Sequence, residues 1–293
     1  MFIQAVEKCE DDHPITGGGG PAPTVRIRPA SGRLSPDLKE LWEYRDLFYL
    51  LTLRDVSVRY QQTAIGVGWA ILQPLLMMLM FTLVFGRLAG VPSEGLPYPV
   101  FACAALLPWN YFAQAVSRCG SSLVGNANLV SKVYFPRLIV PLSAAAAPLV
   151  DLAVSLGLLL ALVAWYGITP SWGLLTLPLF LALAVFTALS VGIWLAALNV
   201  RYRDVGHVIP FLVQFWMFAT PVAYPLGLVP SPWRPFFRLN PMTGVVEGFR
   251  WALVGGKGYD LVAVASGFAV ALVLLVSGIL YFHRVEDTLV DVI

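Results

Sequence analysis

The chain of 293 residues is 58% hydrophobic and 12% charged, with a net charge of +2 and a mean hydropathy of +0.75. Soluble domains carry about 25% charged residues, so this composition excludes an ordinary water-soluble globule. A helix needs about 20 apolar residues to cross a membrane, and several windows without Asp, Glu, Lys or Arg reach that length. The sequence therefore predicts an integral membrane protein.

The chain before the long apolar windows falls into two parts. Residues 1–37 combine acidic side chains with a GGGG run, and we expect a flexible cytoplasmic tail without an assigned role. Residues 38–62 mix charged side chains with Trp42 and Phe48 at roughly helical spacing, which predicts an amphipathic helix in the membrane interface. A helix that packs on a protein partner would have the same pattern. Both interpretations place the segment at the cytoplasmic surface.

Residues 63–293 form the predicted membrane domain. Because its apolar runs are continuous instead of alternating, they predict helices and not a membrane barrel. We predict an all-α integral membrane protein with six spans, at about residues 66–86, 100–117, 138–164, 173–198, 207–224 and 260–282. At the start of the first span, Gly66 and Gly68 allow the chain to turn from the interface into the membrane.

The positions of the basic residues set the orientation, because cytoplasmic loops of membrane proteins carry an excess of Lys and Arg. With the N-terminus inside, fourteen of the nineteen Lys and Arg residues fall on the cytoplasmic side, and reversal would invert that ratio. We therefore predict that both termini lie in the cytoplasm.

The segment between the fifth and sixth spans, residues 222–258, is rich in both proline and aromatic residues. A solvated loop would not need aromatic rings, and prolines interrupt long helices. We predict re-entrant outer helices that are buried in protein or line a cavity. An amphipathic loop resting on the membrane surface is the alternative.

Few residues have the pattern of a chemical site. The chain lacks the G-x-x-x-x-G-K-[ST] phosphate loop, and no pair of histidines has metal-ligand spacing, so we expect neither a catalytic nor a metal site. Asp151 is the one acidic residue in the interior of a predicted span, where a carboxylate is costly. A hydrogen bond with Ser155 or a group on a paired helix would satisfy it. We favour a structural or gating role, since a proton-coupled carrier would need several such groups.

Two groups of aromatic residues lie in the second and fifth predicted spans. Phe211, Phe215 and Phe218 fall on one face of the fifth span, and Trp109 and its neighbours cluster in the second. Such rings serve most often as core or lipid contacts. They also suit a conduit in which flat rings slide along the faces of a large amphipathic solute.

Four segments in order carry a family resemblance. They are RDVSVRYQQTAIGVGWAILQP at 54–74, LVSKVYFPRLIVP at 129–141, LNVRYRDV at 198–205, and TPVAYP at 220–225 followed by LNPMTGVVEGFRWAL at 239–253. With the six predicted spans, they resemble the membrane subunit of type-2 ABC exporters that move polysaccharides. The resemblance covers residues 41–282 and leaves the N-terminal tail unmatched.

The resemblance implies a homodimer of permeases bound to two copies of a separate nucleotide-binding subunit in the inner membrane. A lipid-linked polysaccharide, with O-antigen as the favoured cargo, would leave through a channel between the permeases. ATP and Mg²⁺ would be bound by the partner subunit, so this chain would hold no cofactor and would not be an enzyme. Membrane lipids are the other expected partner, and we expect no nucleic acid.

The resemblance also implies roles for particular residues. Those expected to couple the permease to the ATPase lie in the N-terminal helix and in the loop at 126–137: Arg54, Arg59, Asn126, Lys132, Tyr134 and Arg137. The candidates for the channel wall are aromatic: Trp69, Trp109, Tyr111, Phe112, Phe211, Phe215 and Phe218. The candidates for an outer gate lie in the proline-rich segment: Tyr224, Pro225, Trp233, Asn240, Pro241 and Arg250.

Two other functions stay open. The same architecture could export teichoic acid, a drug or another lipid-linked cargo. A membrane-embedded glycosyl- or acyltransferase also handles lipid-linked sugars, but such an enzyme needs acidic or histidine clusters at the membrane surface. The one acidic cluster, Glu10 to Asp12, lies in the predicted tail.

Overall fold

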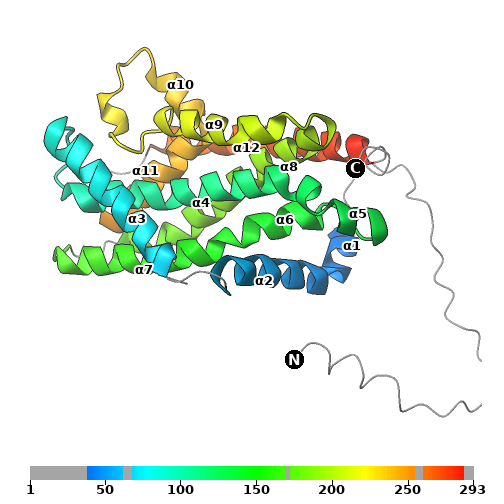
Figure 1. The fold of residues 1–293 in the computed structure, drawn as a ribbon. Helices are drawn as coiled ribbons and strands as arrows, with labels where there is room; N and C mark the ends of the chain where they lie inside the picture. Colours follow the sequence, from blue (N-terminus) through cyan, green and yellow to red (C-terminus); the bar gives the residue numbers. More distant parts are fainter. Residues whose placement is uncertain (1–37, 62–67, 169–171, 255–259, 287–293) are drawn as a thin grey trace, which may run out of the picture. The chain divides into compact units, whose positions relative to one another are not determined.

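The computed structural model describes residues 38–61, 68–168, 172–254 and 260–286. The chain divides into residues 1–33 and a compact unit, Leu34–Ile293, and the description below concerns the second unit alone. The predicted tail at 1–37 and the turn at Gly66 lie outside the described residues. Within those residues every regular element is a helix (Figure 1), which confirms the all-α prediction.

The helices follow one another with short connections. In chain order they are α1 Leu38–Glu43, α2 Arg45–Gln61, α3 Gly68–Phe81 with the π-helical turn η2 Thr82–Leu88, α4 Tyr98–Gly125, α5 Ala127–Lys132, α6 Ile139–Ala146, α7 Pro148–Trp165, η3 Trp172–Thr176, α8 Leu177–Arg201, α9 Val205–Phe218, η4 Leu226–Leu228, α10 Arg234–Leu239, α11 Pro241–Val254 and α12 Leu261–Glu286. Proline occupies the first turn of α4, α7, α8 and α10, where its missing N–H costs no helical hydrogen bond.

Four stretches are long and apolar enough to cross a membrane: Gly68–Leu88, Ile139–Trp165, Trp172–Arg201 and Leu261–Glu286. Each contains most of one predicted span. The helices at the other two predicted spans, α4 and α9, do not meet both criteria. The 28-residue α4 carries Asn110, Gln114 and Arg118, and the 14-residue α9 is only about 21 Å long. That these two helices also cross the membrane stays a prediction.

Helix α4 forms the centre of the described unit. It packs against α8, α6, α7, α11, α3 and α9, and its side chains are buried from Val100 through Trp109. Figure 1 shows α4 between α9 on one side and α6 and α7 on the other, with α3 crossing it. Because protein surrounds it, α4 tolerates polar residues that a lipid-facing helix could not satisfy.

The predicted interface helix is two helices, α1 and α2, separated at Tyr44. Helix α2 packs on α6 of the same chain and buries Leu51. Its other side leaves Tyr49, Leu50 and Val58 exposed. The structure therefore shows both features that the sequence left open, a packed face and an exposed apolar face, and contact with the membrane interface stays a prediction.

Helix α11 is held against α12 by a close backbone approach. A Cβ atom on Gly244 would lie 2.8 Å from the Cα atom of Val264 and 2.9 Å from the carbonyl oxygen of Ala263. Such distances lie inside van der Waals contact, and backbone atoms cannot move aside cheaply. Glycine is therefore required here by packing.

Candidate functional site

A buried polar cluster lies where α2, α3, α4 and α7 meet. The Oδ2 atom of Asp151 on α7 lies 2.6 Å from Nη1 of Arg59 on α2, and Oδ1 accepts a hydrogen bond from the hydroxyl of Tyr60. The same Nη1 donates to Oε1 of Gln114 on α4 at 2.6 Å. The carboxylate that the sequence placed inside a span is thus paired with a cation and a hydroxyl from the N-terminal helix.

Tyr60 acts in this cluster as a neutral donor. Burial, followed by the hydrogen bond to Asp151, raises the pKa of Tyr60 to about 12. The phenol therefore keeps its proton at physiological pH and can donate it to the carboxylate. Asp151 has two partners, and one of them carries no charge.

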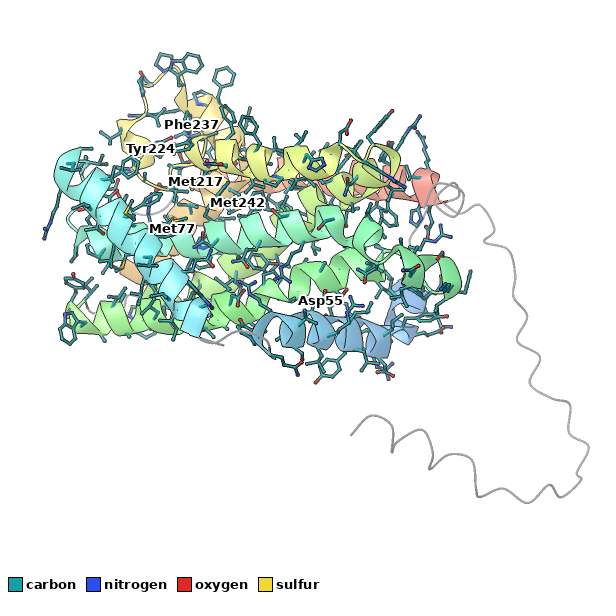
Figure 2. The ribbon with its side chains drawn as sticks, in the orientation of Figure 1. Asp55, Met77, Met217, Tyr224, Phe237 and Met242 are labelled. Atoms are coloured by element: carbon teal, nitrogen blue, oxygen red, sulfur yellow. The ribbon has the colours of Figure 1, made fainter. Side chains whose placement is uncertain are left out.

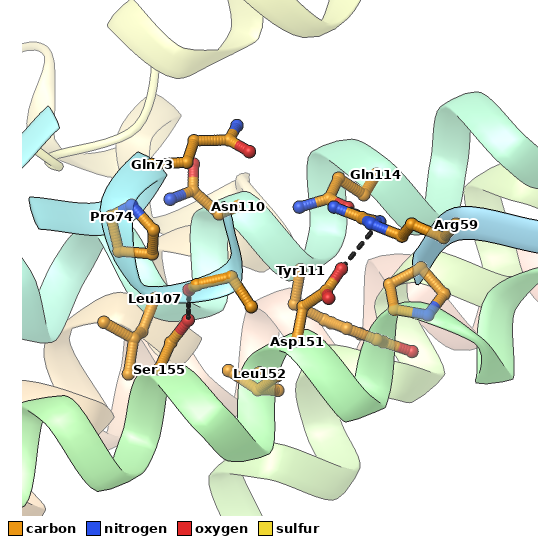
Figure 3. A pocket seen from close by; sticks show the side chains of 12 residues that line it. Arg59, Gln73, Pro74, Leu107, Asn110, Tyr111, Gln114, Asp151, Leu152 and Ser155 are labelled. Atoms are coloured by element: carbon orange, nitrogen blue, oxygen red, sulfur yellow. Dashed lines mark hydrogen bonds and ion pairs between the residues drawn. The ribbon is translucent and has the colours of Figure 1, made fainter. Parts of the chain in front are cut away.

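Ser155, one turn along α7 from Asp151, has a different partner from the one considered in the sequence. Its hydroxyl donates to the carbonyl oxygen of Ala70 on α3 at 3.3 Å. Figure 3 shows this bond beside the ion pair of Arg59 and Asp151. Of the two ways to satisfy Asp151, the structure shows the paired helix, and Ser155 instead joins α7 to α3.

A small cavity and an open cleft adjoin the cluster. The cavity has a volume of about 20 Å³ and reaches Gln73, Asn110 and Ser155, so it is too small for a sugar ring (Figure 3). The cleft has a volume of about 510 Å³, which is in the range of ligand sites. Its lining comes from α2, α3, α4 and α9: Arg59, Gln73, Trp109, Ala113, Gln114, Ser117, Arg118, Pro210, Val213 and Gln214.

The aromatic candidates for a channel wall separate into two sets. Phe211, Phe215 and Phe218 on α9 are 72%, 67% and 59% exposed, and Trp69 on α3 is 46% exposed. The other set is in the core of the subunit: Trp109, Tyr111 and Phe112. Only the first set presents its rings on the surface of this subunit, although Trp109 also reaches the edge of the cleft.

The predicted coupling residues other than Arg59 gather around α5 and the segment that follows it. Arg54 on α2 donates through Nη2 to Oδ1 of Asn126, at the junction of α4 and α5, over 2.9 Å. Beyond α5, Lys132 is exposed and Tyr134 is 70% exposed, whereas Phe135 is buried and anchors the segment. These contacts link α2 to the α5 segment and leave a free surface beside the link.

Two predicted coupling residues make contacts inside the subunit. Arg137 donates through Nη1 to the backbone carbonyl of Glu286 at the end of α12. Arg59 lies in the polar cluster, with 27% of its side chain exposed. Direct contact of either residue with an ATPase stays a prediction.

Arg250 organises the predicted outer segment, of which residues 222–254 are described. Its side chain is 5% exposed, donates to the backbone carbonyl oxygens of Val222 at 2.6 Å and Tyr224 at 3.4 Å, and pairs with Glu247 at 3.1 Å. The guanidinium carbon also lies 3.8 Å from the centre of the Phe101 ring. Arg250 therefore fixes the TPVAYP turn to α4 and α11.

Asn240 fixes the same turn from a second position. Its Nδ2 donates to the carbonyl oxygen of Ala219 at 3.0 Å and to Oγ1 of Thr220 at 2.9 Å, and its Oδ1 accepts from Nε1 of Trp216 at 3.0 Å. Pro241 begins α11 directly after it. Asn240 thus joins the end of α9 to the start of α11.

The remaining gate candidates differ in exposure. Tyr224 donates to the carbonyl oxygen of Phe218 at 2.9 Å and lies beside Phe237, with ring centres 6.5 Å apart (Figure 2). Pro225 is buried, whereas Trp233 is 60% exposed. The predicted outer segment is therefore mostly packed against the rest of the unit, with the Trp233 ring exposed.

Several residues of the sites were not singled out by the sequence. Tyr60, Gln73, Arg118, Phe101 and Glu247 received no role from the sequence, although Tyr60 and Gln73 lie in the segment at 54–74 and Glu247 in that at 239–253. The partners of Tyr60 and Phe101, which are Asp151 and Arg250, are distant in sequence. Local signals were available for Arg118, a cation directly after a predicted span, and for Glu247, three residues before Arg250.

Comparison with known proteins places this arrangement in a family. The ABC-2 type transporter family matches residues 46–254. The chain is 32% identical to the O-antigen export system permease protein RfbA of Myxococcus xanthus over 241 residues, which cover 81% of this chain and 92% of that protein. It is 24% identical to the protein of the same name from Klebsiella pneumoniae, with 85% and 95% covered.

A further relative is the polysialic acid transport protein KpsM of Escherichia coli, at 25% identity over 82% of this chain and 93% of that protein. These similarities extend over nearly the whole length of each relative. With the family match and the apolar helices, they make the chain a multi-pass membrane protein and a transport subunit. The chain belongs to the ABC-2 type transporter family.

Proposed function

We propose that this chain is the permease subunit of an ATP-driven exporter that moves O-antigen polysaccharide out of the cytoplasm across the inner membrane. The observation that carries the proposal is the 32% identity to an O-antigen export permease over 81% of this chain and 92% of that protein. The similarity to a protein named for polysialic acid transport also supports a polysaccharide as the cargo. No step of the proposal requires catalysis by this chain.

The proposed assembly is a homodimer with two copies of a nucleotide-binding subunit. In it α4 and α9 complete six spans, α10 and α11 form re-entrant outer helices, and both termini lie in the cytoplasm. The burial of α11 against α4, α8 and α12 supports a short helix held within protein at membrane depth. The exposed aromatic face of α9 supports a surface for a second permease and for polymer.

Coupling is proposed to run through the inner end. A push on the exposed α5 segment, at Lys132 and Tyr134, would reach α2 through the hydrogen bond of Arg54 with Asn126. From α2 it would reach α7 through the ion pair of Arg59 with Asp151. Such a path transmits work only if the ATPase contacts differ between its nucleotide states.

Deletion of the gene and complementation test the cargo. We expect the deletion to remove the surface polysaccharide while lipid-linked polymer accumulates inside, and the intact gene to restore the surface polymer. Affinity purification from membranes should recover an ATP-binding subunit in equal number. A drug exporter would instead leave the polymer intact and change drug resistance, and recovery of a monomer without an ATPase would contradict the proposal.

A further inference from the structure

The cleft lined by α2, α3, α4 and α9 holds more positive than negative charge. Arg59 and Arg118 both line it, and Asp151 neutralises Arg59. Earlier on α2, Arg54 and Asp55 pair with each other at 2.9 Å. Among the described residues no carboxylate lies within ion-pair distance of Arg118, which is partly buried. The cleft therefore favours an anion.

Hydrogen-bond donors in the cleft suit a phosphate group. Within the described part of the chain, Arg59 uses only Nη1, which leaves Nε and Nη2 without a partner. The amide side chains of Gln73 and Gln214 also face the cleft, from α3 and α9. Planar guanidinium groups bind phosphate oxygens through paired, charge-assisted hydrogen bonds, and amides add neutral donors.

Two of the helices that line the cleft also expose apolar side chains. On α3 the side chains of Leu79 and Met80 are both 57% exposed, and α9 exposes Phe211 and Phe215. A small hydrophilic anion would gain nothing from these surfaces. An amphipathic molecule would place its charged group in the cleft and its hydrocarbon chain along the two helices.

We propose that this cleft binds the phosphate group of an amphipathic lipid, with Arg118 and Arg59 as its ligands and Asp151 as an internal anion that competes for Arg59. The assignment deepens the proposed function, on which its meaning for transport rests. The phosphate could belong to a lipid-linked cargo or to a membrane phospholipid. Both sources present the same anionic group on a hydrocarbon chain.

The cluster around Asp151 makes such competition feasible. When Arg59 turns its free donors toward a phosphate, the hydrogen bond from Tyr60 still satisfies Oδ1 of Asp151. The carboxylate is then not left alone in a buried site, which is the costly arrangement. Removal of its charge should release Arg59 fully and strengthen phosphate binding.

Native mass spectrometry of the purified full chain in detergent tests the site. The probes are farnesyl diphosphate, dioleoyl phosphatidate and farnesol, which carry a diphosphate, a phosphate monoester and no charge. We expect both phosphates to bind at least tenfold more tightly than farnesol, since charge-assisted hydrogen bonds are lost with the phosphate. A preference for the diphosphate assigns the site to a lipid-linked cargo, and equal binding assigns it to phospholipid.

Variants locate the binding in the cleft. We expect Arg118→Gln to weaken binding of both phosphates by about tenfold, and Asp151→Asn to strengthen it. Arg45→Gln, an exposed arginine on α2 outside the cleft, is the matched control and should bind as the wild type does. Arg118 has no ion pair in the described residues, so its replacement leaves no buried carboxylate behind.

Two results would overturn the assignment: unchanged phosphate binding by Arg118→Gln, or farnesol binding as tight as that of the phosphates. The binding measurement does not depend on transport. If a deletion strain keeps its surface polysaccharide while the purified chain binds phosphates through Arg118, the proposed function fails and the site stands. If export is confirmed but Arg118→Gln binds normally, the site fails and the function stands.

Discussion

Two regions of the molecule each contain an arginine paired with an acid, and the two pairs, called inner and outer after the predicted orientation, are built differently. In the inner pair, Arg59 reaches Asp151 and Gln114 through one nitrogen, borders an open cleft and remains 27% exposed. In the outer pair, Arg250 is 5% exposed and binds Glu247, two backbone carbonyls and the face of Phe101.

The difference shows how the same residue type serves two purposes. Arg250 uses both terminal nitrogens for hydrogen bonds to Glu247 and to the backbone of the outer turn, and only its buried Nε has no partner in the described residues, so it holds the outer turn in one conformation. Arg59 lies beside a cleft and has no partner for Nε and Nη2 in the described residues, so it can exchange partners. We therefore regard the outer pair as structural and the inner pair as exchangeable, and the predictions below test that distinction.

The largest expected effect is the loss of Arg250. Arg250→Leu would leave Glu247 buried without a cation and two carbonyl oxygens without donors. We expect the free energy of unfolding to fall by about 3 kcal/mol or more. Thermal unfolding of the detergent-solubilised protein measures this, with the exposed outer residue Arg87→Leu as the control. If Arg250→Leu lowered the free energy of unfolding no more than the control does, the structural role of Arg250 would be contradicted.

A smaller loss is expected where α11 meets α12. Gly244→Ala would press a methyl group against the backbone of Val264, at a cost of about 1–3 kcal/mol in unfolding free energy. Gly157→Ala on the exposed side of α7 is the matched control, because a Cβ atom there meets nothing within 4 Å. That change should stabilise the helix by up to about 1 kcal/mol. If the two variants had equal unfolding free energies, the backbone of α11 and α12 would have moved apart to accept the methyl group.

A pair of double-mutant cycles compares the two ion pairs directly. One cycle joins Arg59→Gln with Asp151→Asn, and the other joins Arg250→Gln with Glu247→Gln. We expect a coupling energy of about 1 kcal/mol for the inner pair and a larger one for the outer pair, because the Arg59 side chain is 27% exposed and that of Arg250 is 5% exposed. Denaturation of the four single and two double variants supplies the values. A stronger inner coupling would reverse the comparison.

The smallest effect on stability is expected at the exposed α5 segment. Lys132→Glu and Tyr134→Ala should each change the unfolding free energy by less than about 0.5 kcal/mol, because neither side chain is packed. Both should nevertheless reduce the amount of co-purified ATPase, if this surface is the contact. Arg87→Glu, at the opposite end, should retain the ATPase. Full retention by both variants would refute the coupling assignment.

Much of the fold followed from local patterns, and the deviations have identifiable causes. The sequence predicted a fifth span ending near residue 224, but α9 ends at Phe218. Arg250 and Asn240 bind the carbonyl groups that follow, and those residues form turns instead of helix. The second predicted span ended at 117, but α4 continues to Gly125 because its polar end packs against protein.

The candidate site was predictable only in part. The cost of a charge among apolar residues singled out Asp151, but nothing local pointed to Arg59 and Tyr60, whose α-helix lies about ninety residues earlier. Arg118 and the glutamine side chains gained meaning only when three helices placed them around one cleft. Aromatic content alone did not distinguish the buried Phe112 from the exposed Phe215.

By itself the sequence determined that the chain enters a membrane, because apolar length and charge placement act residue by residue and need no knowledge of contacts. The same local rules determined its helices and many of their ends. Tertiary structure decided which charges meet, since the energy of an ion pair depends on distance and burial. As a result, Arg250 is buried and bound to the turn around it, whereas Arg59 has donors that bind no group in the described residues.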